Sequence, residues 1–215
     1  MFINIHTHVL HQNGIEILNL EGAEKGISYF STGIHPYQAH ETDLDFKAII
    51  ENSQKENCLA IGESGLDKII STPIDIQTVV FKKQIEISEN NHLPLILHCV
   101  KAWNEVLIVK KEVKPKQTWI FHGFRKTALL GSVLENNLMV SIGTPIIYDL
   151  KLQKLFHQIP LDQLFLETDS DDRFTIEEVY KKAAELSGIS LDVLKIQISA
   201  NFKRNFSKFK NESVG

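Results

Sequence analysis

Residues 2–8 of the chain read FINIHTH, a short apolar run that ends in two histidines. Further apolar runs of similar length recur along the sequence, and several of them also end in a polar or ionisable residue. They lie at residues 2–5, 27–30, 58–61, 93–97, 118–121, 138–142 and 163–166. Short continuous apolar runs are typical of strands buried on both faces of a parallel sheet. We therefore interpret these seven runs as strands of one buried sheet.

Stretches of helical length separate several of these runs. Residues 75–90 place apolar and charged side chains on opposite faces of a predicted helix, and residues 125–136 predict another. Helices at 175–186 and 191–206 would make the C-terminal third helical. Residues 15–20 alternate with a period of two, which predicts a short strand in place of the first barrel helix. The order of elements predicts an α/β fold, a somewhat truncated TIM-like (β/α) barrel with parallel strands and a helical C-terminus.

The bulk properties predict one domain over residues 1–215. The chain is 43% hydrophobic and 23% charged, which is enough to bury one sizeable core. Cys58 and Cys99 lack the spacing of a zinc site or a disulfide framework and are interpreted as reduced thiols. Without a basic leader or a long apolar segment, the protein is expected to be cytoplasmic, away from membranes and without an obligate protein partner. Its net charge of −4 means that only local charges would attract nucleic acid.

Ionisable residues follow the predicted strands. In barrels of this kind the loops after the strands converge on one mouth, where the chemistry lies. The residues at these positions are His6, His8, His35, Glu63, His98, His122 and Asp169. One such histidine alone is most often an ordinary hydrogen-bonded residue, but the coincidence of a His-x-His, one glutamate, two further histidines and one aspartate on five separate strand ends favours metal ligation. By contrast, we interpret His11, His40, His92 and His157, which fall in predicted loops or helices, as solvated.

The ligand types indicate two divalent ions, because imidazole and carboxylate groups suit zinc, manganese and similar ions and six groups exceed one tetrahedral site. Glu63 is expected to bridge the ions, since a carboxylate has two oxygens. Asp169 is expected to bind a metal and to accept the proton of the attacking water. The histidines are expected to divide between the ions, His6 and His8 on one and His98 and His122 on the other.

Blocks around these residues resemble a known family. They are NIHTH at 4–8, GIHP at 33–36, AIGESGLD at 60–67, LPLILH at 93–98, FHGF at 121–124, ETD at 167–169 and NFKRNF at 201–206. Together they resemble the TatD-related metal-dependent deoxyribonucleases, within the amidohydrolase-like barrels. The resemblance implies two or three divalent ions (Mg, Mn or Zn) and phosphodiester hydrolysis with DNA as substrate. It carries metal roles onto His6, His8, Glu63, His98, His122 and Asp169, and we predict that Glu167 helps to bind an additional ion.

The predicted mechanism assigns Asp169, Glu63 and His35 to catalysis. A metal-bound water, with its pKa lowered toward about 7, would lose a proton with help from Asp169 and attack the phosphorus. His35 would contact the substrate phosphate or orient a ligand through a hydrogen bond.

The chain departs from the family pattern at several positions. Asn4 replaces the usual aspartate, and the arginine expected after His98 is absent. Lys101, Arg125 and Lys126 are therefore candidates for binding phosphate, with solvated surface charges as an equally weighted alternative. The acidic run at 170–172 predicts either an extra metal site or a helix cap. Candidates for stacking on bases, or simply for packing, are Tyr37, Trp103, Phe124 and Tyr148.

Two other classes of function stay open. The same binuclear site would suit an amidohydrolase acting on an amide or lactone, and a barrel that had lost its ligands would be a non-catalytic scaffold. Many amidohydrolase relatives carry a carboxylated lysine on the fourth strand, whereas this strand ends in His98. All six ligands are also present. Phosphodiester hydrolysis is therefore the favoured prediction.

Overall fold

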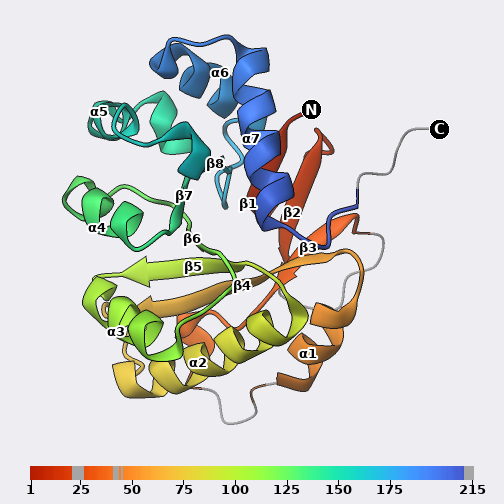
Figure 1. The fold of residues 1–215 in the computed structure, drawn as a ribbon, viewed down its shortest axis with the longest axis vertical. Helices are drawn as coiled ribbons and strands as arrows, with labels where there is room; N and C mark the ends of the chain where they lie inside the picture. The colour runs from red at the N-terminus through yellow and green to blue at the C-terminus, as the bar shows by residue number, and fades with distance from the viewer. Residues whose placement is uncertain (21–26, 41–43, 45, 211–215) are drawn as a thin grey trace. The chain divides into compact units, whose positions relative to one another are not determined.

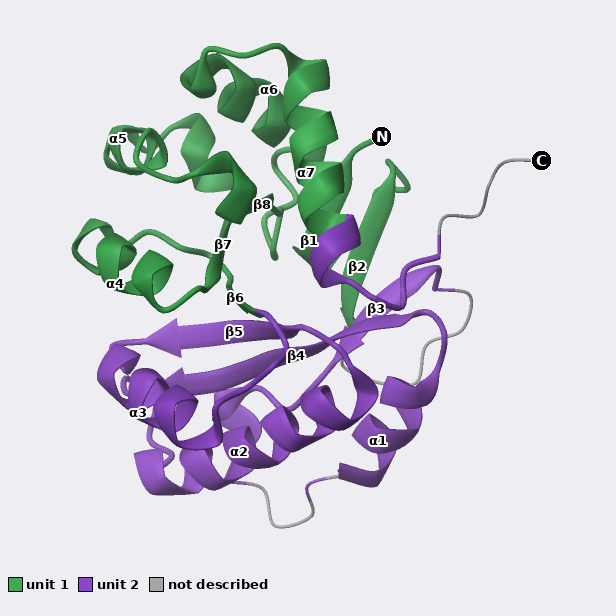
Figure 2. Ribbon diagram, in the orientation of Figure 1, with its two compact units in different colours: residues 1–19, 119–202 green, residues 20–118, 203–215 purple. Residues whose placement is uncertain are grey.

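The structure is a computed structural model that describes residues 1–20, 27–40, 44 and 46–210. The chain forms two compact units (Figure 2). Unit 1 comprises residues 1–19 and 119–202, and unit 2 comprises residues 20–118 and 203–215. The prediction of a single domain stays a prediction.

The described residues contain eight strands, which follow one another in chain order. They are β1 (Ile3–Thr7), β2 (Ile15–Leu20), β3 (Tyr29–Thr32), β4 (Cys58–Asp67), β5 (Leu95–Val100), β6 (Trp119–Phe121), β7 (Met139–Ile142) and β8 (Leu164–Leu166). In unit 1, β1 pairs with β2 and β7 pairs with both β6 and β8, all in parallel. A parallel bridge between Thr7 and Asp169 joins β1 to the residues after β8. In unit 2, β4 pairs in parallel with β3 and β5.

Seven α-helices connect or follow these strands in the described chain (Figure 1). They are α1 (Phe46–Gln54), α2 (Ile74–Asn91), α3 (Trp103–Val113), α4 (Leu130–Glu135), α5 (Leu150–Phe156), α6 (Ile176–Ser187) and α7 (Leu191–Asn205). Short 3-10 turns lie at Pro36–Gln38, Thr127–Leu129, Thr144–Ile147 and Leu161–Gln163. The predicted strand at 15–20 and the helices at 75–90, 175–186 and 191–206 are confirmed within a few residues.

Two predicted elements have different bounds in the structure. The helix expected at 125–136 is shorter, because residues 127–129 form a 3-10 turn and α4 spans only Leu130–Glu135. The strand expected at 58–61 is longer and continues to Asp67, and all ten of its residues are buried.

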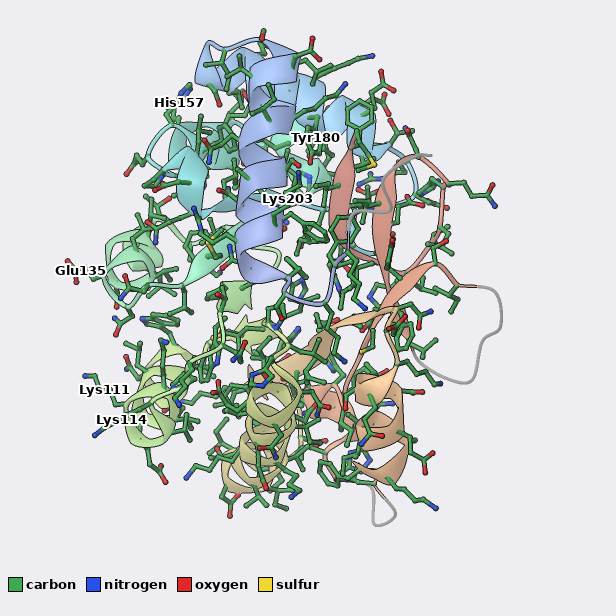
Figure 3. The ribbon with its side chains drawn as sticks, turned by 45° about the vertical axis from the view of Figure 1, so that its right-hand side comes forward. Lys111, Lys114, Glu135, His157, Tyr180 and Lys203 are labelled. Atoms are coloured by element: carbon green, nitrogen blue, oxygen red, sulfur yellow. The ribbon has the colours of Figure 1, made fainter. Side chains whose placement is uncertain are left out.

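Each unit has its own buried core. In unit 1 the buried Tyr180 of α6 (Figure 3) binds the start of β1. Its hydroxyl accepts a hydrogen bond from the Ile3 amide at 3.1 Å and donates to the Ile3 carbonyl at 3.0 Å. A capping box between Thr175 and Glu178 begins α6, and Gly188 ends it in the left-handed conformation. In unit 2 the helices α1, α2 and α3 lie along β4 and β5 (Figure 1).

Among the described residues, none of the helices has the length and apolar character that crossing a membrane requires.

Candidate metal centre

Unit 2 gathers a set of ionisable side chains that we call the Glu63 cluster: His35, Glu63, Asp67 and His98. Ligand atoms of His35, Glu63 and His98 all lie within 4.8 Å of one another. His98 Nδ1 lies 2.7 Å from Glu63 Oε1 and 3.2 Å from His35 Nε2. On its other side, His98 Nε2 lies 3.2 Å from Asp67 Oδ2. Both nitrogens of His98 are therefore within hydrogen-bonding reach of a buried carboxylate.

A close approach of two strands positions this cluster. Gly65 of β4 is in register with His98 of β5, and Glu63 and Asp67 lie two residues to either side of it. Side chains two apart on a strand share a face, so both carboxylates lie on the same face of β4. At Gly65 a Cβ atom would meet the His98 carbonyl oxygen at only 1.9 Å, and φ is +148°. Only glycine fits there.

Two buried glutamines of α2 fix the strand ends that carry the cluster. The Gln84 side chain accepts from the Ile34 amide at 2.7 Å and donates to the Ile34 carbonyl at 3.0 Å, next to His35. The Gln77 side chain makes the same pair of bonds, both 2.8 Å, with the backbone of Asp67, and also donates to the Thr72 carbonyl at 2.7 Å. Side-chain amides thus take the place of sheet hydrogen bonds at the edge of the cluster.

Unit 1 gathers a second set, which we call the Asp169 cluster: His6, His8, His122, Glu167 and Asp169. The ligand atoms of His6, His8 and Asp169 lie within 4.8 Å of one another. Asp169 Oδ1 is 3.7 Å from His6 Nε2 and 3.5 Å from His8 Nε2. The His6 and His122 rings lie 4.6 Å apart. The Asp169 side chain is 40% exposed, whereas the side chains of the Glu63 cluster are between 6% and 18% exposed.

The backbone holds Asp169 in place. Its amide donates to the His6 carbonyl and its carbonyl accepts from the His8 amide, both at 3.0 Å. Asp169 also has φ of +56°, which is uncommon for a residue with a side chain and concentrates at functional sites. Main-chain bonds therefore set the position of this carboxylate relative to both histidines.

Glu167 is a fully buried carboxylate. Its Oε1 accepts a hydrogen bond from the Gly123 amide at 2.6 Å and lies 3.7 Å from His122 Nδ1. Burial alone would raise its pKa, but the neighbouring His122 and His6 imidazoles more than offset this, so the pKa of Glu167 lies below its usual range. Its Oε2 is buried and accepts no hydrogen bond from the described residues. Such an oxygen suits a metal ligand.

Asn4 has a structural role next to this cluster. Its side chain donates to Thr168 Oγ1 at 2.8 Å and accepts from the Thr168 amide at 3.1 Å. A neutral amide supplies both the donor and the acceptor at this fully buried position.

The donor sets of both clusters fit divalent ions. Each combines imidazole with carboxylate, and each places three ligand atoms within the span that one ion can bridge. His35 belongs to the Glu63 cluster, where its contact with His98 favours the orienting role over direct phosphate binding. His98 belongs to unit 2 and His122 to unit 1, and the predicted sharing of an ion by these two residues stays a prediction.

A pocket of about 170 Å³ opens beside the Asp169 cluster within unit 1. Its lining comes from the segments after β6, β7 and β8 and from α5: Gly123, Arg125, Gly143, Thr144, Pro145, Leu152, Glu167, Thr168, Asp169, Ser170 and Asp171. Arg125 is the one predicted phosphate-binding residue among them, and its guanidinium lies 3.0 Å from the Asp149 carboxylate. Lys101 and Lys126 are exposed, and their role stays a prediction.

The structure separates the other candidates by exposure. Trp103 and Phe124 are buried, which favours packing, whereas Tyr37 and Tyr148 are about half exposed. His40, His92 and His157 are exposed as predicted, and His157, labelled in Figure 3, directly follows α5. His11 is only half-buried. The run 170–172 does not cap α6, because Thr175 does.

Sequence reasoning missed Asp67. Its contact with His98 places it in the Glu63 cluster, although the sequence interpretation ended the strand at Ile61. The four-residue spacing from Glu63 along an extended chain was the available signal, since even spacings share a face.

A family model described as TatD related DNase matches residues 2–207. The metal-dependent hydrolase YabD of Bacillus subtilis (strain 168), named as uncharacterized, is 30% identical over 196 residues, which cover 83% of this chain and 77% of that protein. The 3'-5' ssDNA/RNA exonuclease TatD of Rahnella sp. (strain Y9602) is 29% identical over 171 residues, or 74% of this chain and 63% of that one.

Solved structures show the same fold. The crystal structure of YJJV, a TatD homologue from Escherichia coli K12, matches with a TM-score of 0.70 at 22% identity, over 83% of this chain and 76% of that one. A TatD family hydrolase from Entamoeba histolytica also matches with a TM-score of 0.70, at 16% identity, over 84% of this chain and 75% of that one. Together with the parallel strands in chain order, this likeness confirms the predicted barrel class.

Proposed function

The chain belongs to the TatD related DNase family of metal-dependent hydrolases, and from that premise we propose that it hydrolyses phosphodiester bonds in nucleic acid, with DNA as the substrate. One observation carries the proposal: imidazole and carboxylate atoms converge within 4.8 Å in each of the two clusters. The relative named as a 3'-5' exonuclease acting on single-stranded DNA and RNA supports the substrate class.

In this proposal the two clusters hold the metal ions. The ligands are His6, His8, Glu63, His98, His122 and Asp169, with Glu167 as a further carboxylate for an additional ion. A bound divalent ion polarises a phosphoryl oxygen and lowers the pKa of water. The accessible carboxylate of Asp169 accepts the proton of the attacking water, while Glu63 and His35 keep the His98 ring oriented. Mg, Mn and Zn are the ions to test.

The test uses the purified full chain. A chelator should abolish cleavage of a labelled single-stranded oligonucleotide and of a simple phosphodiester, and adding back magnesium, manganese or zinc should restore it. Elemental analysis measures the bound ions in parallel. The substitution Glu63→Gln should lower the metal content. A chain that cleaves neither phosphodiester with any of the three ions would overturn the proposal, and hydrolysis of a lactone or amide instead would favour the amidohydrolase alternative.

A further inference from the structure

Four side chains tie together the loops that follow β7 and β8 in unit 1. Thr144 Oγ1 donates to Asp171 Oδ2 at 2.6 Å. Arg173 donates to both oxygens of Asp171, from Nε and from Nη2, at 2.8 Å each. Arg173 Nη2 also lies 3.2 Å from the hydroxyl of Tyr148. The bidentate pair fixes the plane of the Arg173 guanidinium.

This network brings the Arg173 guanidinium close to two aromatic rings. The guanidinium carbon of Arg173 lies 5.5 Å from the centre of the Tyr148 ring and 5.8 Å from that of Phe174. The two rings lie 6.1 Å apart with their planes at 33°. We call Tyr148, Arg173 and Phe174 the stacking cluster. Tyr148 is 51% exposed and the Arg173 side chain is 65% exposed, so both side chains are accessible from solvent.

Stability does not account for such an arrangement. An ion pair as exposed as that of Arg173 adds little to the free energy of unfolding, because water screens it and because holding a long side chain costs entropy. Preorganising flat groups in solvent instead lowers the entropy cost of binding a flat ligand.

The charges indicate what kind of ligand fits. The carboxylate of Asp171 offsets the positive charge of the Arg173 guanidinium. The hydrogen bonds from Arg173 hold the pKa of the Asp171 carboxyl well below its usual range, although the slight burial of Asp171 acts in the opposite direction. The cluster is therefore not a free positive charge for a phosphate. Its π faces and its delocalised guanidinium suit the face of another planar ring.

The cluster adjoins the pocket of the Asp169 cluster. Asp171, which accepts from Arg173, and Thr144, which donates to Asp171, line that pocket together with Glu167 and Asp169. We propose that the stacking cluster binds an unpaired nucleobase of a nucleic-acid strand next to the pocket of the Asp169 cluster, an inference that rests on the proposed function for its catalytic part. It deepens that function by naming the residues that hold an unpaired base, which only an unstacked strand offers, because the bases of a duplex are already stacked on one another.

The direct test measures binding with a chelator present and at low salt, where hydrolysis cannot occur. The probes are a short fluorescently labelled oligothymidylate and an abasic oligonucleotide with the same number of phosphates. Fluorescence anisotropy should show that the parent protein prefers the oligothymidylate by about fivefold or more. Tyr148→Ala should remove this preference. Tyr148→Phe should keep it, since the ring remains. Leu150→Ala, which changes an exposed side chain two residues away, should also keep it.

A kinetic arm separates this inference from the proposed function. If the parent protein hydrolyses phosphodiesters, Tyr148→Ala should raise the KM for single-stranded DNA and leave the KM for a dialkyl phosphodiester without a base unchanged. If the parent protein hydrolyses no phosphodiester, the proposed function fails, and the binding arm still decides the inference. Equal binding of the two probes by the parent protein, or an unchanged preference in Tyr148→Ala, would overturn it.

Discussion

The Glu63 cluster and the Asp169 cluster are built from the same two ligand types, yet the protein holds them in different ways. In the Glu63 cluster, imidazole and carboxylate bond directly at 2.7 and 3.2 Å, and both carboxylates are buried. In the Asp169 cluster, Asp169 lies 3.5 Å or more from the two histidines and is 40% exposed. Side-chain bonds therefore position the first cluster, and main-chain bonds position the carboxylate of the second.

This difference indicates that the two clusters have different roles. A buried, mutually bonded set is suited to holding a metal in fixed geometry, and its disturbance should cost stability as well as activity. An exposed carboxylate beside a pocket is suited to meeting water and substrate, and its loss should cost activity alone. Variants in each cluster can break or sharpen this comparison.

The largest effect is expected for Asp169→Asn. The amide cannot accept the proton of the attacking water, so kcat should fall by about 10²- to 10⁴-fold. Because the side chain is exposed and its backbone bonds remain, the melting temperature measured with a chelator present should stay close to that of the parent. Asp172→Asn is the matched control, an exposed acid three residues away that should keep full activity. A large loss of stability in Asp169→Asn would show that the two clusters are not held differently.

Gly65→Ala should disturb the Glu63 cluster more than any change of a surface residue. The new methyl group would meet the His98 carbonyl oxygen at 1.9 Å, and backbone atoms cannot move aside cheaply. We expect a loss of about 3 kcal/mol in the free energy of unfolding, measured by urea denaturation. Gly131→Ala is the control, because a Cβ there meets nothing within 4 Å and α4 should gain up to about 1 kcal/mol. Equal stability of the two variants would contradict the close approach of β4 and β5.

Gln77→Ala tests the outer support of the same cluster. It removes three hydrogen bonds to buried backbone groups at Asp67 and Thr72, which should cost about 2 kcal/mol of unfolding free energy. Gln153→Ala is the counterpart in unit 1. Its side chain bonds two carbonyls at 2.9 and 3.3 Å from a half-buried position, so the loss should be smaller, about 0.5 kcal/mol. Thermal melts of both variants, with a chelator present, measure the difference. If Gln153→Ala costs as much as Gln77→Ala, side-chain bonding does not distinguish the two regions.

The sequence predicted the elements that periodicity controls. The alternation at 15–20 correctly indicated β2, and the long amphipathic stretch at 75–90 correctly indicated α2. Strand ends were harder, because an apolar run ends where polar residues begin, whereas β4 continues through Glu63 and Asp67 while remaining buried. Buried polar residues satisfied by a neighbouring strand and by Gln77 leave no hydrophobic signal.

The candidate site followed the same pattern. Placing ionisable residues after each strand identified both clusters, since parallel strands bring their ends together. It did not identify partners contributed by distant elements, such as the Gly123 amide on Glu167 or the Thr144 hydroxyl on Asp171. Such contacts depend on the packing of loops, which spacing along one strand does not encode.

The last prediction tests whether water is excluded from the interior at Cys58, the first residue of β4. Burial raises the pKa of the Cys58 thiol to about 12. In the unfolded chain a cysteine thiol has a pKa of about 8.5. Below that pH the thiol is protonated in both states, so it adds no pH dependence. As the pH rises above the pKa of the unfolded chain, the thiol of the unfolded chain loses its proton first, and the folded state is progressively destabilised until the folded pKa is passed.

Cys58→Ala should therefore cost stability at pH 7, because the variant lacks the buried thiol. This cost should shrink by about 1 kcal/mol at pH 9.5, because only the parent protein is destabilised by the rise in pH. Urea denaturation of parent and variant at the two pH values measures it. A constant difference between them would mean that water reaches the start of β4, and that the closed character of the Glu63 cluster does not extend along its strand.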